Sequence, residues 1–284
     1  MTAPFPDYGY PIVMALVIVA VGLSYVVRLV TRGAARFDRT TKIGGSFLLS
    51  QTVLEWWYWM MKPVARAMVA VGLSANGVTW LSLVFGAAAG FAIAGGRFGL
   101  AAALGVTSAL LDILDGFVAR LTDSSSDAGE VLDAAVDRYT EFFLLAGLCV
   151  HYRDHLAILV TALFATLGSF LISYSTAKAE AMKVEPPRGA MRRHERAVYL
   201  LTGSAVASIT IALFEPQRFQ RPIGVPMVLA LAIVAVVSNV SAARRMAAIA
   251  RAVRARELAL VAREKSAAPV DDLTVHEEAS GEAQ

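Results

Sequence analysis

Residues 112–138 read DILDGFVARLTDSSSDAGEVLDAAVDR, and both flanks of this stretch are strongly apolar. GLAAALGVTSALL precedes it and YTEFFLLAGLCV follows it. Four aspartates, Asp112, Asp115, Asp133 and Asp137, therefore stand at the ends of two segments that are apolar enough to lie in lipid. Acidic residues in membrane helices are costly and usually mark a functional site.

The composition indicates a membrane protein built from helices. Hydrophobic residues make up 57% of the 284-residue chain and charged residues 17%, whereas soluble domains carry about 25% charged residues. The apolar residues gather in runs of about 20, the length of helix that crosses a bilayer core. We therefore predict an all-α, polytopic membrane helix bundle. The single cysteine, Cys149, excludes a disulfide framework and a cysteine-based metal site.

Seven apolar runs are predicted to span the membrane, one extra N-terminal helix followed by a six-helix core. They cover residues 11–30, 76–95, 99–120, 130–150, 156–178, 197–214 and 222–242. A further apolar segment, residues 45–70, is interrupted by charges and carries Trp56, Trp57 and Trp59. Because indole rings favour the headgroup layer, this segment is predicted to be an amphipathic helix lying on the membrane surface.

The predicted domain boundaries follow from these runs. The extra transmembrane helix and a basic linker cover residues 1–43, the interfacial helix 44–70, the transmembrane core 71–242, and a basic helix with an acidic tail 243–284. We expect the last dozen or so residues to be disordered, because they are polar and acidic. The first run has no basic segment before it, so it is predicted to be a retained helix rather than a signal peptide.

The basic residues lie strongly on one side of this seven-span path. RLVTRGAARFDRTTK, KVEPPRGAMRRHER and the start of the tail share that side, and the positive-inside rule makes it the cytoplasm. We therefore predict a multi-pass cell-membrane protein with its N-terminus outside and its C-terminus in the cytoplasm. The aspartates then lie just below the cytoplasmic membrane surface.

The spacing of the aspartates predicts one shared site. Asp112 and Asp115 are three residues apart and Asp133 and Asp137 four apart, so each pair lies on one helix face. The loop between the pairs is short, which makes the helices antiparallel neighbours and brings the four carboxylates together. Such a group cannot stay ionised without a cation, and carboxylate-rich oxygen sets suit Mg²⁺, Mn²⁺ or Ca²⁺. Solvated charge at helix ends is the alternative, and it suits the loop aspartates better than Asp112 and Asp115.

The pattern resembles the signature of the CDP-alcohol phosphotransferases at every fixed position. The matching residues are Asp112, Asp115, Gly116, Ala119, Arg120, Gly129, Asp133 and Asp137. The resemblance extends over about residues 70–242. It implies that an alcohol hydroxyl attacks the β-phosphorus of a CDP-linked lipid, such as CDP-diacylglycerol, and that CMP leaves as a phosphodiester forms.

The resemblance also implies roles for the site residues. Asp112, Asp115 and Asp133 would ligate a pair of divalent ions, Mg²⁺ or Mn²⁺, while Asp137 would take the proton of the hydroxyl and also contact a metal. The nucleotide would be bound by Gly116, Ala119, Arg120 and Gly129. A homodimer is expected, with the lipid bilayer and the two substrates as partners and with no nucleic acid.

Asn76 and Thr79 stand at the start of the first core helix, where the family often has a similar pair. They are expected to serve the nucleotide site. Capping of that helix by Ser74 or Asn76 is an equally weighted alternative.

A basic stretch at residues 173–201, SYSTAKAEAMKVEPPRGAMRRHERAVYLL, is the candidate acceptor site. We expect Lys178, Arg192 and Arg196 to bind the phosphate of a phosphorylated alcohol. The stretch resembles the region of bacterial phosphatidylinositol-phosphate synthases that binds inositol 1-phosphate, although Lys178 stands where an arginine is expected. Anchoring to anionic lipid headgroups is the alternative explanation for these charges.

Inositol 1-phosphate is therefore the favoured acceptor, and three alternatives stay open. Glycerol 3-phosphate, the acceptor of phosphatidylglycerophosphate synthases, is also anionic, and an uncharged alcohol is less favoured. A cation transporter is a different class of protein that also uses intramembrane carboxylates. It is disfavoured because transporters place them near mid-membrane, and release of CMP from a CDP-lipid separates the two classes.

Overall fold

A computed structural model describes residues 5–33, 51–187, 189–214 and 222–267 of the chain. Every regular element in these ranges is a helix, so the predicted all-α class is confirmed. The helices are α1 (Gly9–Arg32), α3 (Gln51–Ala70), α4 (Ala75–Ala94), α5 (Phe98–Leu121), α6 (Asp127–His151), α7 (Leu156–Ala181), α8 (Arg193–Phe214) and α9 (Val225–Ala267). Residues 44–50 of the predicted interfacial helix and the predicted disordered tail lie outside the described residues.

Each of the seven predicted spans lies on a helix, and the ends agree to within a few residues except for the last span, which was predicted to end at residue 242 whereas α9 continues to Ala267. Six of the described helices, α1, α4, α5, α7, α8 and α9, are long and apolar enough to cross a membrane. The exception is α6, whose otherwise apolar second half begins with Asp137, Arg138 and Glu141. Composition alone therefore does not mark α6 as a span, although α4 packs extensively on α6 as well as on α5.

Small residues bring the core helices close together. A Cβ atom on Gly147 of α6 would lie 2.2 Å from the carbonyl oxygen of Gly90 on α4, so the two backbones are in direct contact there. Close approach through small side chains is the usual way in which membrane helices pack, because lipid provides no hydrophobic drive for their association. This contact fixes α6, with its acidic residues, against α4, which also packs on α5.

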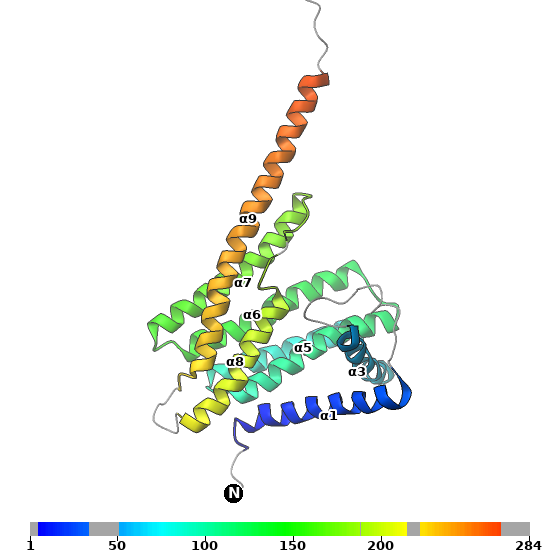
Figure 1. The fold of residues 1–284 in the computed structure, drawn as a ribbon, viewed down its shortest axis with the longest axis vertical. Coiled ribbons are helices and arrows are strands. Elements are labelled where there is room, and N and C mark those ends of the chain that lie inside the picture. Colours follow the sequence, from blue (N-terminus) through cyan, green and yellow to red (C-terminus); the bar gives the residue numbers. More distant parts are fainter. Residues whose placement is uncertain (1–4, 34–50, 188, 215–221, 268–284) are drawn as a thin grey trace, which may run out of the picture.

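The extra N-terminal helix is attached to the core through a helix cap. The carboxylate of Asp7 accepts hydrogen bonds from the backbone N–H groups of Gly99 (2.7 Å) and Leu100 (3.1 Å), the first turn of α5. An acidic group at a helix N-terminus satisfies free N–H donors and interacts favourably with the helix dipole. As a result α1 and α5 start at the same end of the bundle, and α1 lies along its edge (Figure 1).

Helix α3 runs across the direction of α1 and α5 and is seen nearly end-on in Figure 1. Its buried residues Met61 and Ala65 pack in a cluster with Leu111, Leu114 and Phe117 of α5. An amphipathic helix that lies across the spans has the orientation expected of a surface helix. It covers the part of α5 that carries the aspartates.

Helix α9 is a single unbroken helix of 43 residues. Its first half packs along α7 and α8, and its C-terminal part projects beyond the other helices (Figure 1). The predicted boundary between residues 242 and 243 therefore falls inside a continuous helix.

Candidate active site

A tight turn between α5 and α6 builds the acidic part of the site. Ser126 is the N-cap of α6, and its hydroxyl accepts a hydrogen bond from the backbone N–H of Gly129 at 3.1 Å. The turn covers only residues 122–126, so α5 and α6 run antiparallel. This geometry places the last turns of α5 beside the first turns of α6.

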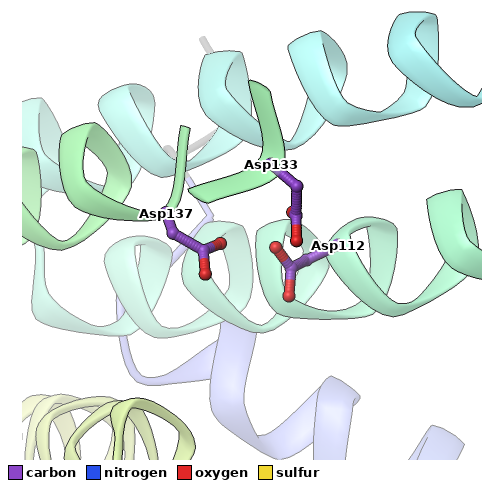
Figure 2. Close-up of side chains that lie close together, drawn as sticks. All are labelled: Asp112, Asp133 and Asp137. Atoms are coloured by element: carbon purple, nitrogen blue, oxygen red, sulfur yellow. The ribbon is translucent and has the colours of Figure 1, made fainter. Parts of the chain in front are cut away.

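Asp112, Asp133 and Asp137 form the carboxylate cluster. One oxygen from each lies within 4.8 Å of the others, and the three side chains point toward one another from α5 and α6 (Figure 2). Asp133 Oδ1 is buried without a hydrogen-bond partner among the described residues. A buried acceptor without a partner is costly, and a hard divalent cation ligated by these oxygens would remove that cost. The residues present thus fit a Mg²⁺ or Mn²⁺ site.

Asp115 belongs to the same patch but is held differently. Its side chain points to α4, where the Thr79 hydroxyl donates a hydrogen bond of 2.7 Å to Asp115 Oδ2. The residue is 9% exposed, and its carboxylate is not part of the three-membered cluster. Thr79 therefore orients Asp115, an aspartate of the motif. The sequence had assigned Thr79 only to the nucleotide site in general.

The other predicted nucleotide residues lie at the same end of the hairpin. Asn76 is exposed beside Gly129 of α6, while the cap of α4 is Ser74, whose hydroxyl accepts from Gly77 N. The guanidinium of Arg120 lies over the ring of Phe117, 4.9 Å from its centroid. It also lies beside Gly116, where a Cβ would be 3.1 Å from Arg120 Nη1. Ala119, one residue before Arg120, is partly buried.

Arg193, the first residue of α8, reaches into the carboxylate cluster. Its Nη1 and Nη2 atoms donate to Asp112 Oδ2 (2.9 Å) and Oδ1 (3.1 Å), and Nη1 lies 2.6 Å from Asp137 Oδ1. The sequence placed Arg193 in the basic stretch but did not assign it a role. The only signal was its position at a helix start facing the aspartates.

The predicted acceptor residue Arg196 is almost completely buried, at 1% exposure. Its Nε and Nη2 atoms donate to the two carboxylate oxygens of Glu141, at 2.5 and 2.8 Å, and Nη1 donates to the carbonyl of Met191. Glu141 was missed by sequence reasoning, although its place four residues after Asp137, in an apolar segment, was a usable signal. The charge of Arg196 is thus matched by the buried carboxylate of Glu141, which also lies 3.5 Å from Arg138 Nη1.

A cavity of about 540 Å³ lies between α6, α7, α8, α9 and the loop that joins α7 to α8. Its charged lining is mainly basic and consists of Arg138, Arg192, Arg193, Arg196 and Arg245, with Glu130 and Glu180. The predicted residue Lys178 is exposed and is not among the residues that line this cavity. The structure therefore brings Arg192 and Arg196 to the cavity but leaves Lys178 outside it.

Arg245 of α9 differs from the other arginines of the cavity. It is 7% exposed, and its Nη2 donates to the carbonyl of Gly189 at 3.0 Å. Its Nε is buried without a hydrogen-bond partner, and no carboxylate lies within ion-pair distance among the described residues. A buried cation without an anion is costly, so this position is suited to an anionic ligand. Sequence reasoning missed it, because residue 245 looked like the start of a cytoplasmic basic helix.

Comparison with known proteins yields a consistent set of relatives. The phosphatidylinositol phosphate synthase of Mycobacterium tuberculosis is 33% identical over 161 residues, which cover 54% of this chain and 73% of that protein. The archaetidylinositol phosphate synthase of Methanothermobacter thermautotrophicus is 30% identical over 148 residues, with 50% and 74% covered.

Solved structures agree with the sequence relatives. The crystal structure of the M. tuberculosis phosphatidylinositol phosphate synthase with manganese and citrate superposes with a TM-score of 0.59 at 27% identity, covering 66% of this chain and 88% of that one. The same enzyme with CDP-DAG bound gives the same TM-score and covers 92% of that chain. The sequence profile of the CDP-alcohol phosphatidyltransferases matches residues 72–238. This chain belongs to the CDP-alcohol phosphatidyltransferase family.

Proposed function

We propose that this protein transfers the phosphatidyl group of CDP-diacylglycerol to the hydroxyl of a small phosphorylated alcohol, with inositol 1-phosphate as the favoured acceptor. The oxygen of the alcohol forms a bond to the β-phosphorus, the bond from that phosphorus to CMP breaks, and CMP leaves. The observation that carries the proposal is the contact between the carboxylate cluster and the arginine-lined cavity. Arg193 touches the cluster and also lines the cavity.

The carboxylate cluster is proposed to hold the divalent ions. Asp112, Asp133 and Asp137 supply oxygens within 4.8 Å of one another, and Asp115, fixed by Thr79, is the fourth ligand expected from the family pattern. Mg²⁺ or Mn²⁺ held by these carboxylates would supply positive charge to the pyrophosphate and to the leaving group.

Asp137 is proposed to accept the proton of the attacking hydroxyl. Both Asp112 and Asp137 contact Arg193, which lines the acceptor cavity, and the family pattern assigns the role of the base to Asp137. A positioned carboxylate that takes a proton in the transition state is a general base. The nucleotide is assigned to the exposed end of the hairpin, where Asn76, Gly116, Ala119, Arg120 and Gly129 lie.

The acceptor phosphate is proposed to bind in the cavity, on Arg192, Arg193 and Arg245. Arginine presents paired donors that match phosphate oxygens, and the buried guanidinium of Arg245 has no described carboxylate within ion-pair distance. Inositol 1-phosphate is preferred over glycerol 3-phosphate because two of the relatives are named for inositol phosphate products. An uncharged alcohol would leave the arginines without an anion.

The direct test is CMP release by the purified protein from CDP-diacylglycerol in the presence of Mn²⁺. Inositol 1-phosphate, glycerol 3-phosphate, inositol and serine are compared as acceptors. We expect the phosphorylated alcohols to support the reaction far better than the uncharged ones, with inositol 1-phosphate first. Equal rates with inositol and inositol 1-phosphate would contradict the role given to the cavity, and no CMP release with any acceptor would contradict the proposed function.

The orientation in the membrane and the homodimer are part of the same proposal. The active site is assigned to the cytoplasmic face, with the N-terminus outside, on the distribution of basic residues. Since Cys149 is the only cysteine, a Cys149→Ser background allows single cysteines to be introduced. A cysteine at position 3 should label in intact cells, and one at position 190 only after permeabilisation. Labelling of both from the same side would contradict the assignment.

A further inference from the structure

Arg193 shares its ligands with the proposed metal site. The two Nη atoms donate to the two oxygens of Asp112, and Nη1 also lies 2.6 Å from Asp137 Oδ1. Asp112 and Asp137 supply two of the three carboxylates of the cluster. A guanidinium and a divalent ion within bonding distance of the same oxygens repel each other. The guanidinium and the metal therefore compete for the cluster.

The side chain of Arg193 can also occupy an alternative position in the cavity. It is the first residue of α8, and its side chain is about one-third exposed and lines the cavity. Its neighbour Arg196, one turn further along α8, is fixed by Glu141 and by the carbonyl of Met191. The helix start is thereby anchored, so a change of side-chain rotamer at Arg193 moves its charge without moving α8.

We propose that Arg193 is a charge-exchange residue that couples the metal site to the acceptor cavity. When the cluster binds a divalent ion, the guanidinium leaves Asp112 and Asp137 and turns toward the cavity, where it becomes available to a phosphate. Metal binding then raises the affinity of the cavity for an anion, and an anion in the cavity raises the affinity of the cluster for the metal by the same factor. The coupling to anion binding rests on the proposed function of the cavity, whereas the displacement of the guanidinium by the metal ion does not.

The first experiment measures Mn²⁺ binding by calorimetry on the full-length protein in detergent, without any substrate. Arg193→Gln should bind Mn²⁺ about 10- to 100-fold more tightly than wild type, since a charge-assisted contact that competes with the metal is gone. The matched control is Arg192→Gln, which removes an exposed arginine of the same cavity that makes no ion pair with the cluster. Its Mn²⁺ affinity should change by less than about threefold, the size expected for a screened distant charge.

Thermal unfolding shows whether the Arg193→Gln variant is correctly folded. In excess chelator, Arg193→Gln should unfold at a lower or equal temperature than wild type, because the cluster has lost its cation. Saturating Mn²⁺ should raise the melting temperature of the variant more than that of wild type. Unchanged or weaker Mn²⁺ binding by Arg193→Gln, or an equal gain in Arg192→Gln, would overturn the exchange.

The second experiment measures binding of inorganic phosphate with and without Mn²⁺. In wild type, Mn²⁺ should tighten phosphate binding severalfold, and in Arg193→Gln this enhancement should disappear. Enhancement that persists in Arg193→Gln would mean that phosphate binds the metal directly, which overturns the coupling. CMP release is assayed separately, so a failure of the proposed function shows as no turnover, while a failure of the exchange shows in the Mn²⁺ and phosphate affinities.

Discussion

The carboxylate cluster and the arginine-lined cavity are built in opposite ways. The cluster comes from one hairpin, in which α5 and α6 are joined by a turn of a few residues and their aspartates recur at helical spacing. The cavity is assembled from four helices and a loop, and Arg245 comes from a helix far along the chain. The first is a local arrangement that a short sequence pattern specifies, whereas the second depends on how distant helices pack.

The two regions also differ in how their charges are balanced. In the cluster, acidic oxygens meet one arginine, Arg193, and Asp133 Oδ1 has no described partner. In the cavity, Arg196 forms an ion pair with Glu141, whereas Arg245 has no described carboxylate within ion-pair distance. One region therefore needs a cation and the other an anion, which is the combination that a metal-dependent transfer to a phosphorylated acceptor requires.

Loss of a cluster aspartate is expected to have the largest effect, and it tests whether the carboxylate cluster is a metal site. Asp112→Asn or Asp133→Asn should abolish CMP release, because each removes a proposed metal ligand. Excess chelator should abolish it in wild type, and added Mn²⁺ should restore it. The control is Asp127→Asn, an exposed aspartate in the first turn of α6, which should keep near-normal activity. Full activity of wild type in excess chelator would contradict the metal assignment.

The next effect separates the proposed base from the metal ligands. Asp137→Asn should lower kcat by about 10²–10⁴, the usual contribution of a general base, while the KM for the acceptor changes little. Steady-state kinetics at saturating Mn²⁺ provide the measurement. If the loss were recovered by raising Mn²⁺ alone, Asp137 would be acting as a ligand rather than as a base.

A smaller effect is expected in the arginine-lined cavity, where Arg245 is proposed to bind the acceptor phosphate. Arg245→Gln should raise the KM for a phosphorylated acceptor by roughly 10- to 100-fold, because a charge-assisted contact is worth about 1.5–3 kcal/mol. The kcat and the KM for CDP-diacylglycerol should remain close to wild type, as expected when uniform binding is lost. Arg244→Gln, its exposed neighbour on α9, is the matched control and should leave the acceptor KM unchanged.

Arg196 provides the contrast within the cavity. Arg196→Gln leaves the buried carboxylate of Glu141 without its main partner, and loss of one member of a buried pair costs about 3–5 kcal/mol. We therefore expect its melting temperature to fall well below that of Arg245→Gln. Equal melting temperatures in the two variants would show that the pairing seen at Arg196 does not distinguish it from Arg245.

The same contrast explains what the sequence could predict. The helices could be predicted because each apolar run has the length of a membrane span. The carboxylate cluster could be predicted because spacings of three and four residues put side chains on one helix face. The roles of Arg245 and Glu141 could not be predicted from the sequence, because they are single charged residues whose partners lie outside their own helices. Lys178 and Arg196 were selected for their charge, but charge in a sequence does not tell whether a side chain faces a cavity, a buried partner or solvent.

Thr79 gives the smallest expected effect and tests whether the cluster depends on support from outside the hairpin. Its hydroxyl donates 2.7 Å to Asp115 Oδ2 from α4, so it orients a proposed ligand without belonging to the metal site itself. Groups that orient metal ligands typically contribute 10- to 100-fold to metal affinity or activity, and Asp115 keeps its other oxygen and its position on α5. We therefore expect Thr79→Val to raise the Mn²⁺ concentration needed for half-maximal CMP release by about tenfold, with kcat at saturating Mn²⁺ nearly restored. Thr79→Ser keeps the hydroxyl and should behave like wild type. If Thr79→Val needed no extra Mn²⁺ and instead raised the KM for CDP-diacylglycerol, Thr79 would serve the nucleotide directly, as the sequence pattern first indicated.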